Sequence, residues 1–268
     1  MILSRITVWI STKILSQSLE QEANNRLSRY GSSYGGWTIC QCANHFSDEG
    51  IFISAGVGED ISFDVEVLRI SNLLAILVDP TDRAETHVNA YLSSSEQLTE
   101  SSYTANGNQP ISSYFSTENV KKRVKFIKKA LWIGNDGLNL YPPLNSSHVS
   151  YKLAHTPDVM NLASKFPSID IKTIITLIES ERIHSSEANF IILKMDIEGS
   201  EFSVLMNLTK SVIRPKQILV ELDFMRERNS YLQLLRLCLF LKVMKKSNYR
   251  LAHIEKLNCL FLDTNASN

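Results

Sequence analysis

The sequence predicts an α/β fold in which helices cover both faces of a twisted, mostly parallel sheet. Short apolar runs of strand length recur along the chain, and each stops at a turn with glycine, proline or acidic residues. Segments with helical spacing separate these runs, as in strand–helix–strand units. The 268 residues are 44% hydrophobic and 21% charged, a composition that allows a sizeable buried core.

The first such unit lies between residues 51 and 91. Residues 51–53 form an apolar strand, followed by the turn S-A-G-V-G and by a helix from Asp60, a candidate N-cap, to residue 68. A second apolar run at 73–78 ends at D-P-T, and residues 82–91 then have helical spacing. Two fully apolar strands around one helix are typical of a parallel βαβ unit with both sheet faces buried.

The rest of the chain supplies further elements. Residues 93–117 are rich in Ser, Thr, Asn and Gln, which predicts a long surface loop or a lid. Six cations within residues 121–129 are interleaved with apolar residues, which predicts a half-buried element with a solvated face. The other expected elements are a hairpin at 130–133 and 138–141 around the turn G-N-D-G, helices at 171–178, 200–208 and 231–246, strands at 190–195 and 218–220, and a closing hairpin at 250–254 and 259–262.

The chain is expected to consist of an arm and one domain. Residues 1–45 predict a peripheral N-terminal arm that is partly helical, with the helix over 16–30. Residues 46–268 predict a single sheet domain that carries the polar insertion near 93–117. The sequence contains no internal repeat, and one large domain fits its length.

Composition and charge exclude several classes of protein. The 28 Lys+Arg and 28 Asp+Glu give a net charge of zero, so no overall positive field would attract nucleic acid. Charged residues interrupt every apolar stretch before about 20 residues, so no integral membrane segment is expected, and the start of the chain lacks the order of a secretory signal. The four cysteines show no disulfide-scaffold or CxxC pattern, which predicts reduced thiols and a cytoplasmic location. Nothing in the sequence indicates the oligomeric state.

Carboxylates and glycines gather at the predicted carboxyl ends of the strands, where open parallel sheets bind their ligands. The candidates are Gly56, Gly58 and Glu59 after the first strand, Asp79 after the second, Asp196 and Glu198 after the strand at 190–195, and Glu221 after the strand at 218–220. The glycine turn lets a ligand approach the backbone, and Asp79 lies where nucleotide-binding folds hold ribose hydroxyls. Turns of this chemistry also form without a ligand, but four strand ends of the same kind favour a site.

The motif D-I-E-G at 196–199 is the sharpest local feature. Asp196 and Glu198 follow a buried strand and repel each other unless a cation, hydrogen-bond donors or a proton is shared. A purely structural role accounts for the next two residues only. Ser200 can cap the following helix, and Glu201 suits its first turn.

These residues stand in a stretch that resembles the signature of the FkbM family of methyltransferases. The stretch reads I-L-K-M-D-I-E-G-S-E at 192–201, with V-L at 204–205. K-T-I at 172–174 with Leu177, and L-V-E at 219–221, are similar to further family segments, so the resemblance extends over residues 51–262. The first turn departs from the family pattern, because Ser54 replaces the usual leading acid and Asp60 the last glycine.

The resemblance implies a class I, Rossmann-like methyltransferase fold with a C-terminal antiparallel hairpin and S-adenosyl-L-methionine as cofactor. It implies that Gly56 is the glycine of the first cofactor motif, and Gly58 and Glu59 of the same turn are further candidates for binding the cofactor. Where the turn departs from the family pattern, Glu59 or Asp60 is the candidate for a compensating acceptor. The resemblance also implies that Asp79 holds the ribose hydroxyls and that Asp136 faces the adenine.

The resemblance further implies the chemistry at the second group of acids. Asp196 and Glu198 would lie beside the donor methyl group and the acceptor, and one of these or Glu221 would be the base. The implied acceptor is a hydroxyl of a sugar, lipid or secondary metabolite, that is, a small molecule or a glycan.

Two other functions remain open from the residues. In a metal-dependent nucleotide-sugar glycosyltransferase, Asp196 and Glu198 would hold Mg²⁺ or Mn²⁺ against a diphosphate, whereas methyl transfer to a hydroxyl needs no metal. A catalytically inactive, methyltransferase-like binding module would keep the fold but bind no cofactor. Weaker candidates are the C-x-C-x-x-H segment at 40–45, whose spacing does not match a zinc site, and His148 and His155 as assisting bases. No metal site is predicted.

Overall fold

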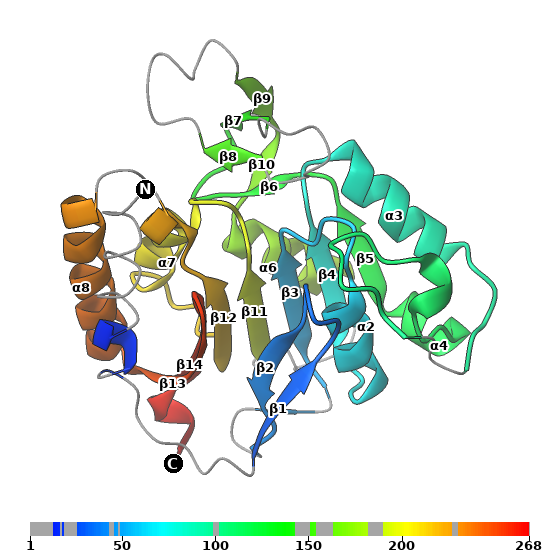
Figure 1. Cartoon of the computed structure of the whole chain (residues 1–268), viewed down its shortest axis with the longest axis horizontal. Helices are drawn as coiled ribbons and strands as arrows, with labels where there is room; N and C mark the ends of the chain where they lie inside the picture. The colour runs from blue at the N-terminus through cyan, green and yellow to red at the C-terminus, as the bar shows by residue number, and fades with distance from the viewer. Residues whose placement is uncertain are drawn as a thin grey trace.

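A computed structural model describes residues 13–16, 18, 26–42, 46–47, 49–98, 102–142, 151–153, 163–181, 190–226 and 230–267. A seven-stranded sheet runs through the middle of the molecule, with helices on both sides and a small separate sheet beyond one end of its strands (Figure 1). The prediction of a mixed α/β fold around a mostly parallel sheet is confirmed.

The seven strands lie in the order β13-β14-β12-β11-β3-β4-β5. Their bounds are β3 (Ile51–Ala55), β4 (Leu74–Val78), β5 (Val124–Ile127), β11 (Ile191–Met195), β12 (Gln217–Glu221), β13 (Tyr249–Glu255) and β14 (Asn258–Asp263). The five strands from β12 to β5 are parallel, and β14 is antiparallel to both β12 and β13. Six of these strands begin and end within two residues of the predicted bounds, because their apolar residues mark them in the sequence. The seventh, β5, lies in the segment 121–129, which was predicted only as a half-buried element.

Two apolar layers sandwich the sheet, because alternate residues of each strand point to opposite faces. On β3, Ile51 and Ile53 belong to one buried cluster and Phe52 to the other. The first layer contains α6 (Ile171–Glu181), α7 (Glu201–Leu208) and α8 (Ser230–Lys246). The second contains α2 (Ser62–Arg69), α3 (Asp82–Leu92) and α4 (Glu118–Lys122). Short 3₁₀ turns lie between or after these helices, at η2 (Ile111–Ser113), η3 (Asp223–Arg226) and η4 (Thr264–Ser267).

The predicted hairpin over 130–141 is wrong. β6 (Ala130–Leu131) pairs in parallel with β10 (Ser168–Ile169), whereas β7 (Leu138–Tyr141) lies between β8 (Lys152–Leu153) and β9 (Ser164–Phe166) in another small sheet. Ser168 provides the physical reason, because its hydroxyl donates to Gly134 O (2.6 Å) and accepts from Gly137 N (3.0 Å). A distant segment therefore satisfies the turn that the local sequence was expected to close.

The N-terminal region differs from the predicted peripheral arm. Residues 13–16 and 18 are helical, but the last part of the expected 16–30 helix is the strand β1 (Leu27–Tyr30), paired with β2 (Trp37–Cys40). β2 packs on the sheet because the Gln217 amide binds both Cys40 N (2.9 Å) and Cys40 O (2.8 Å). Cys40 and Cys42 form a disulfide, contrary to the expected reduced thiols, while Cys238 and Cys259 are free.

The polar insertion near 93–117 is anchored rather than loose in its described part. Tyr114 and Gln109 are buried, and backbone bonds join Gln97 to Ser116 in both directions. The Tyr114 hydroxyl accepts from Ile61 N (3.2 Å) at the start of α2 and lies 2.8 Å from His87 Nε2. Within the described ranges, no helix combines the length and apolar character needed to cross a membrane.

Candidate active site

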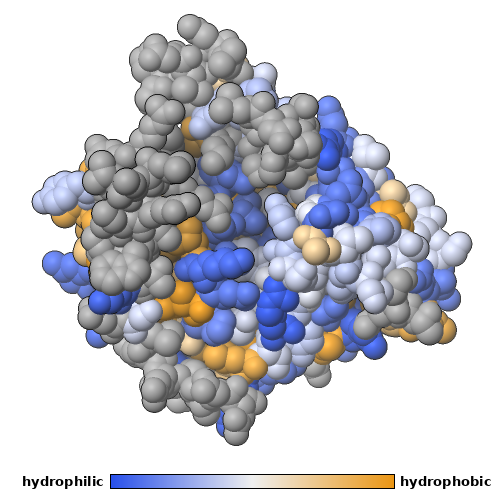
Figure 2. All heavy atoms as spheres, in the orientation of Figure 1, coloured by the Kyte–Doolittle hydropathy of each residue, from blue (hydrophilic) through white to orange (hydrophobic). Residues whose placement is uncertain are grey.

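The structure has a cavity at the carboxyl ends of the middle strands, where the sheet changes its direction of winding. From β3 the chain proceeds to β4 and β5 on one side, whereas β11 and β12 follow on the other. Such a switch point leaves a crevice beyond the carboxyl ends of the two middle strands. A cavity of about 940 Å³ is found there, near the upper end of the range for small-molecule sites. Figure 2 shows hydrophilic residues gathered near the middle of the face seen in Figure 1.

Seven of the eight predicted site residues line this cavity. They are Gly56, Gly58, Glu59, Asp79, Asp196, Glu198 and Glu221. The eighth, Asp136, is exposed in the turn after β6 and does not line it, because Ser168 holds that turn in the neighbouring small sheet. His148, His155 and His45 lie outside the described residues.

Gly56 brings two strand ends into close contact. Its φ of 74° is in the left-handed region, and a Cβ placed on it would lie 1.7 Å from Asp196 O. Any side chain would therefore collide with the backbone of the neighbouring strand end. Gly58 also has a positive φ, 53°, so the G-V-G turn takes a shape that other residues adopt only with strain.

Asp79 is a buried carboxylate that the surrounding chain orients. Thr81 donates to Oδ1 through its backbone N (2.9 Å) and its hydroxyl (2.6 Å), and Gly58 N donates to Oδ2 (3.1 Å). Each carboxylate oxygen has two lone pairs, so Oδ2 can still accept a hydrogen bond from a ligand in the cavity. Burial raises the pKa of Asp79, and the bonds from Thr81 and Gly58 oppose that rise.

Glu59 has a partner within the protein. Its carboxylate forms an ion pair with Arg83 of α3, and its backbone carbonyl accepts from Gln109 N (3.0 Å). Glu59 therefore joins the glycine turn to α3 and to the insertion as well as lining the cavity.

The D-I-E-G turn is held by Glu201, which the sequence analysis treated only as a first-turn residue. Its buried carboxylate accepts from Ile197 N (3.0 Å) and Gly199 N (2.9 Å). Ser200 occupies the N-cap position of α7 without a capping side-chain bond. Glu198 has a φ of 53°, an uncommon conformation that costs on the order of 1–3 kcal/mol. Strain at Glu198 is thus maintained by the bonds to Glu201.

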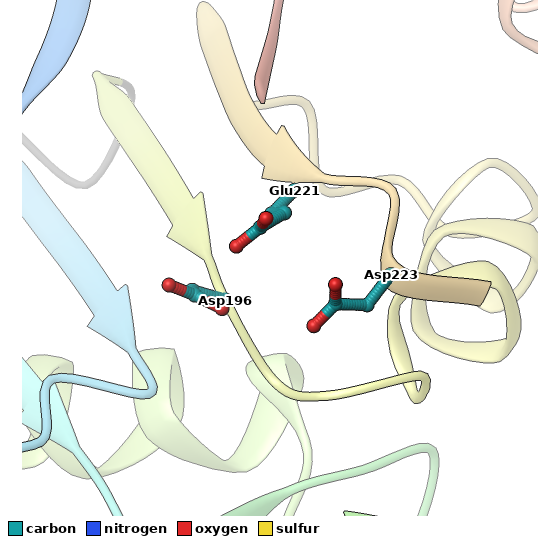
Figure 3. A group of neighbouring side chains, drawn as sticks. All are labelled: Asp196, Glu221 and Asp223. Atoms are coloured by element: carbon teal, nitrogen blue, oxygen red, sulfur yellow. The ribbon is translucent and has the colours of Figure 1, made fainter. Parts of the chain in front are cut away.

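Three carboxylates converge between the ends of β11 and β12. Asp196 follows β11, Glu221 ends β12, and Asp223 begins η3 (Figure 3). One oxygen from each lies within 4.8 Å of the others, so this group could hold a divalent cation. Burial, followed by repulsion from Glu221, raises the pKa of Asp196 well above its usual value.

A second wall of the cavity comes from segments that sequence reasoning did not place there. Ser33, Tyr34, Gly35 and Trp37 of the β1–β2 hairpin line the cavity, as does Gly107 of the insertion. The hairpin is therefore part of the site rather than peripheral. Tyr34 is 63% exposed, so only partial burial, and next the charge of Asp196, raises the pKa of its hydroxyl.

Asp60 holds this second wall together. Its Oδ2 accepts from Ser32 Oγ (2.6 Å) in the hairpin and from Gln109 Nε2 (3.2 Å) in the insertion, while Oδ1 accepts from Ser62 N (3.1 Å). The predicted N-cap position belongs to Ile61, so Asp60 lies one residue before the cap. Its carboxylate binds two loops in addition to the helix start.

Of the functional residues that sequence reasoning missed, Lys194 had a signal. It is a cation within an otherwise apolar strand, and it lines the cavity. The sequence signal for Asp223 was weaker, because it is only an acid that follows the strand-end residue Glu221 by two positions. Tyr34 and Trp37 had none, because the contacts that place them in the site are with residues far away in the sequence.

Comparison with known families agrees with the resemblance seen in the sequence. The family model of the methyltransferase FkbM domain matches residues 40–251, which is most of the chain. No curated protein and no solved structure shows significant similarity to it. The matched residues include β3, β4, β11 and β12 and the acids at their ends. The chain belongs to the FkbM methyltransferase family.

Proposed function

We propose that this protein transfers a methyl group from S-adenosyl-L-methionine to a hydroxyl of a sugar, lipid or secondary metabolite. The observation that carries the proposal is the convergence of the glycine turn, Asp79 and the D-I-E-G acids on one cavity in an FkbM-family chain. The parallel sheet with its antiparallel β13–β14 pair also supports a Rossmann-like, class I arrangement.

The residues around the cavity fit this cofactor in shape and charge. Gly56 and Gly58 leave the backbone open to a close ligand, and Asp79 keeps an acceptor position for ribose hydroxyls. Cavity-lining carboxylates outnumber the cationic side chains, which favours a ligand that carries a sulfonium and an ammonium group. Asp136 has no part in this proposal, since it does not line the cavity.

The cofactor, when bound, supplies an electrophilic methyl group, and the acids of the protein position the acceptor and accept its proton. The acceptor hydroxyl would lie against Asp196, Glu198 or Glu221. A carboxylate whose pKa is raised is a better base near neutral pH than an ordinary one, which favours the Asp196–Glu221 pair. Alignment of the oxygen with the methyl group and exclusion of water by the two walls supply the rest.

A metal-dependent transfer of a nucleotide sugar is the second candidate. The observation in its favour is the group of Asp196, Glu221 and Asp223. Its members differ from the pair Asp196 and Glu198 that the motif first suggested. Hard oxygen ligands of this kind suit Mg²⁺ or Mn²⁺.

Calorimetric titration separates these proposals. We expect the wild type to bind S-adenosyl-L-methionine and S-adenosylhomocysteine without added metal, and Asp79→Asn to weaken both by about tenfold or more through loss of a charge-assisted bond. Retained affinity in Asp79→Asn would contradict the ribose role. No binding by the wild type would contradict the methyltransferase and favour the inactive module, unless Mg²⁺-dependent binding of a nucleotide sugar replaced it.

A cytoplasmic location is also a proposal. The free thiols of exposed Cys238 and buried Cys259 agree with it, whereas the Cys40–Cys42 disulfide does not. Cell fractionation followed by thiol labelling tests it, and recovery of the protein outside the cytoplasmic fraction would overturn it.

A further inference from the structure

Lys194 is a buried cation that the proposed reaction does not yet use. It lies in β11, between Leu193 and Met195, and is only 3% exposed. Its neighbour across the sheet is Ser54 of β3, two residues before Gly56. The side chain lines the cavity on the α2 side of the glycine turn.

The ammonium group contacts the ring of Trp37, and its charge also lowers the pKa values of Asp64, Asp79 and Asp196 against the rise that burial causes. Lys194 Nζ lies 5.7 Å from the centroid of that ring, within the range of a cation–π contact. Among the residues that the structure describes, none forms a hydrogen bond or ion pair with Lys194. Three N–H donors therefore have no acceptor in the described part of the chain.

Asp64 interacts with Lys194 through charge alone, because burial raises the pKa of Asp64 and the charge of Lys194 opposes that rise. This aspartate of α2 is 1% exposed, and neither of its oxygens has a hydrogen-bond partner among the described residues. Burying a charge is costly unless it is paired and hydrogen-bonded. The interaction with Asp64 uses none of the donors of Lys194, whose side chain lines the cavity.

We propose that Lys194, held by Trp37, binds the carboxylate at the amino-acid end of S-adenosyl-L-methionine. The inference rests on the proposed function. The cavity is otherwise rich in acids, so the one carboxylate of this ligand needs a cation, and Lys194 is the buried one that faces it. An ammonium with open donors forms charge-assisted hydrogen bonds to a carboxylate.

The order of the strands gives the proposed ligand a direction. Asp79 follows β4 and Lys194 lies on β11, with β3 and its glycine turn between them. Two strand spacings separate the outer strands by about 10 Å. A ribose bound at Asp79 and an amino-acid chain that ends at Lys194 would therefore lie across Gly56 and Gly58, where the backbone leaves room.

The test combines a substitution with a change in the ligand. Calorimetry measures the affinities of S-adenosyl-L-methionine and of its decarboxylated analogue for the wild type, Lys194→Met and Lys256→Met. Lys256 is the matched control, because it also lines the cavity but is exposed in the β13–β14 turn. Lys194→Gln gives the same comparison with a polar side chain if methionine at this position unfolds the protein.

We expect Lys194→Met to weaken S-adenosyl-L-methionine by about ten- to a hundredfold, as for loss of a charge-assisted bond, and to leave the decarboxylated analogue unchanged or tighter. Lys256→Met should keep the wild-type preference. Equal losses for both ligands in the Lys194 variants, or no loss, would overturn the inference. A wild type that binds neither ligand would instead contradict the proposed function itself.

Discussion

The two walls of the cavity are built by different kinds of interaction. The first, which we call the sheet wall, consists of the ends of β3, β4, β11 and β12, which continuous parallel ladders hold in register. The second, which we call the added wall, consists of the hairpin turn at 31–36 and the insertion segment at 104–109, which side-chain bonds to Asp60 connect. The first wall carries Asp79 and Asp196, and the second carries Tyr34.

This difference indicates how each wall should respond to substitution. The sheet wall shares the stability of the buried core, so its positions shift only when the strands themselves are forced apart. The added wall depends on a few hydrogen bonds, each of which contributes about 1 kcal/mol. One substitution can therefore release it while the sheet remains folded.

The largest effect is expected at Gly56. Gly56→Ala places a Cβ 1.7 Å from Asp196 O on a residue with a φ of 74°, so the ends of β3 and β11 must move apart. We expect loss of cofactor binding and a free energy of unfolding lower by about 3 kcal/mol, measured by calorimetry and denaturant unfolding.

Gly134→Ala is the matched control. A Cβ on Gly134 meets no atom within 4 Å, so this variant should bind and unfold like the wild type. If the two alanine variants bound the cofactor and unfolded alike, the close contact of the strand ends would not be needed for binding or for stability.

The added wall should open selectively in Asp60→Asn. An amide nitrogen in place of Oδ2 would face the donor Gln109 Nε2, and Ser32 Oγ, which already accepts from Tyr34 N and Gly35 N, would lose its acceptor. We expect local opening to become easier by about 1–3 kcal/mol. Hydrogen exchange would show this as faster exchange at 31–36 and 104–109.

Exchange in β11 should stay slow in Asp60→Asn, because its ladders are unchanged. Asp82→Asn, at an aspartate whose side chain is 90% exposed, serves as the control. If β11 exchanged faster as well, the two walls would not be energetically separate.

A smaller effect is expected from pH at His87. Burial lowers the pKa of His87 below its usual 6.5, while its Nε2 lies 2.8 Å from the Tyr114 hydroxyl. The folded state disfavours the charged form, so the stability that neutral His87 contributes is complete above pH 6.5 and is lost as pH falls below it. The contact between His87 and Tyr114, which helps to anchor the insertion, should therefore weaken in acid.

Denaturant unfolding at about pH 7.5 and about pH 5.5 measures this loss. We expect the wild type to lose about 1 kcal/mol more than His87→Gln, which keeps a polar group and does not titrate. Parallel losses in the two proteins would rule out His87 as the group that responds.

The sheet wall could be predicted from the sequence, and the added wall could not. The strands that precede Asp79 and Asp196 are largely apolar, and the turn residues follow them directly, so the positions of these two acids depend on local sequence. The bonds of Asp60 join residues 28 and 49 positions away, and no local pattern indicates them. Lys194 was visible as a charge in a buried strand, but its contact with Trp37 was not.

The smallest effect is expected at Asp136, where the family resemblance and the structure disagree. The resemblance implied that Asp136 faces the adenine, but this side chain is exposed and lies outside the cavity lining. Asp136→Asn should therefore change cofactor affinity by less than about twofold and unfolding by less than about 0.5 kcal/mol, as for most surface substitutions. A tenfold loss of affinity in the same calorimetric titration would mean that the turn at 134–137 moves onto the bound cofactor. In that case the small sheet around β7 would be a third, ligand-dependent wall.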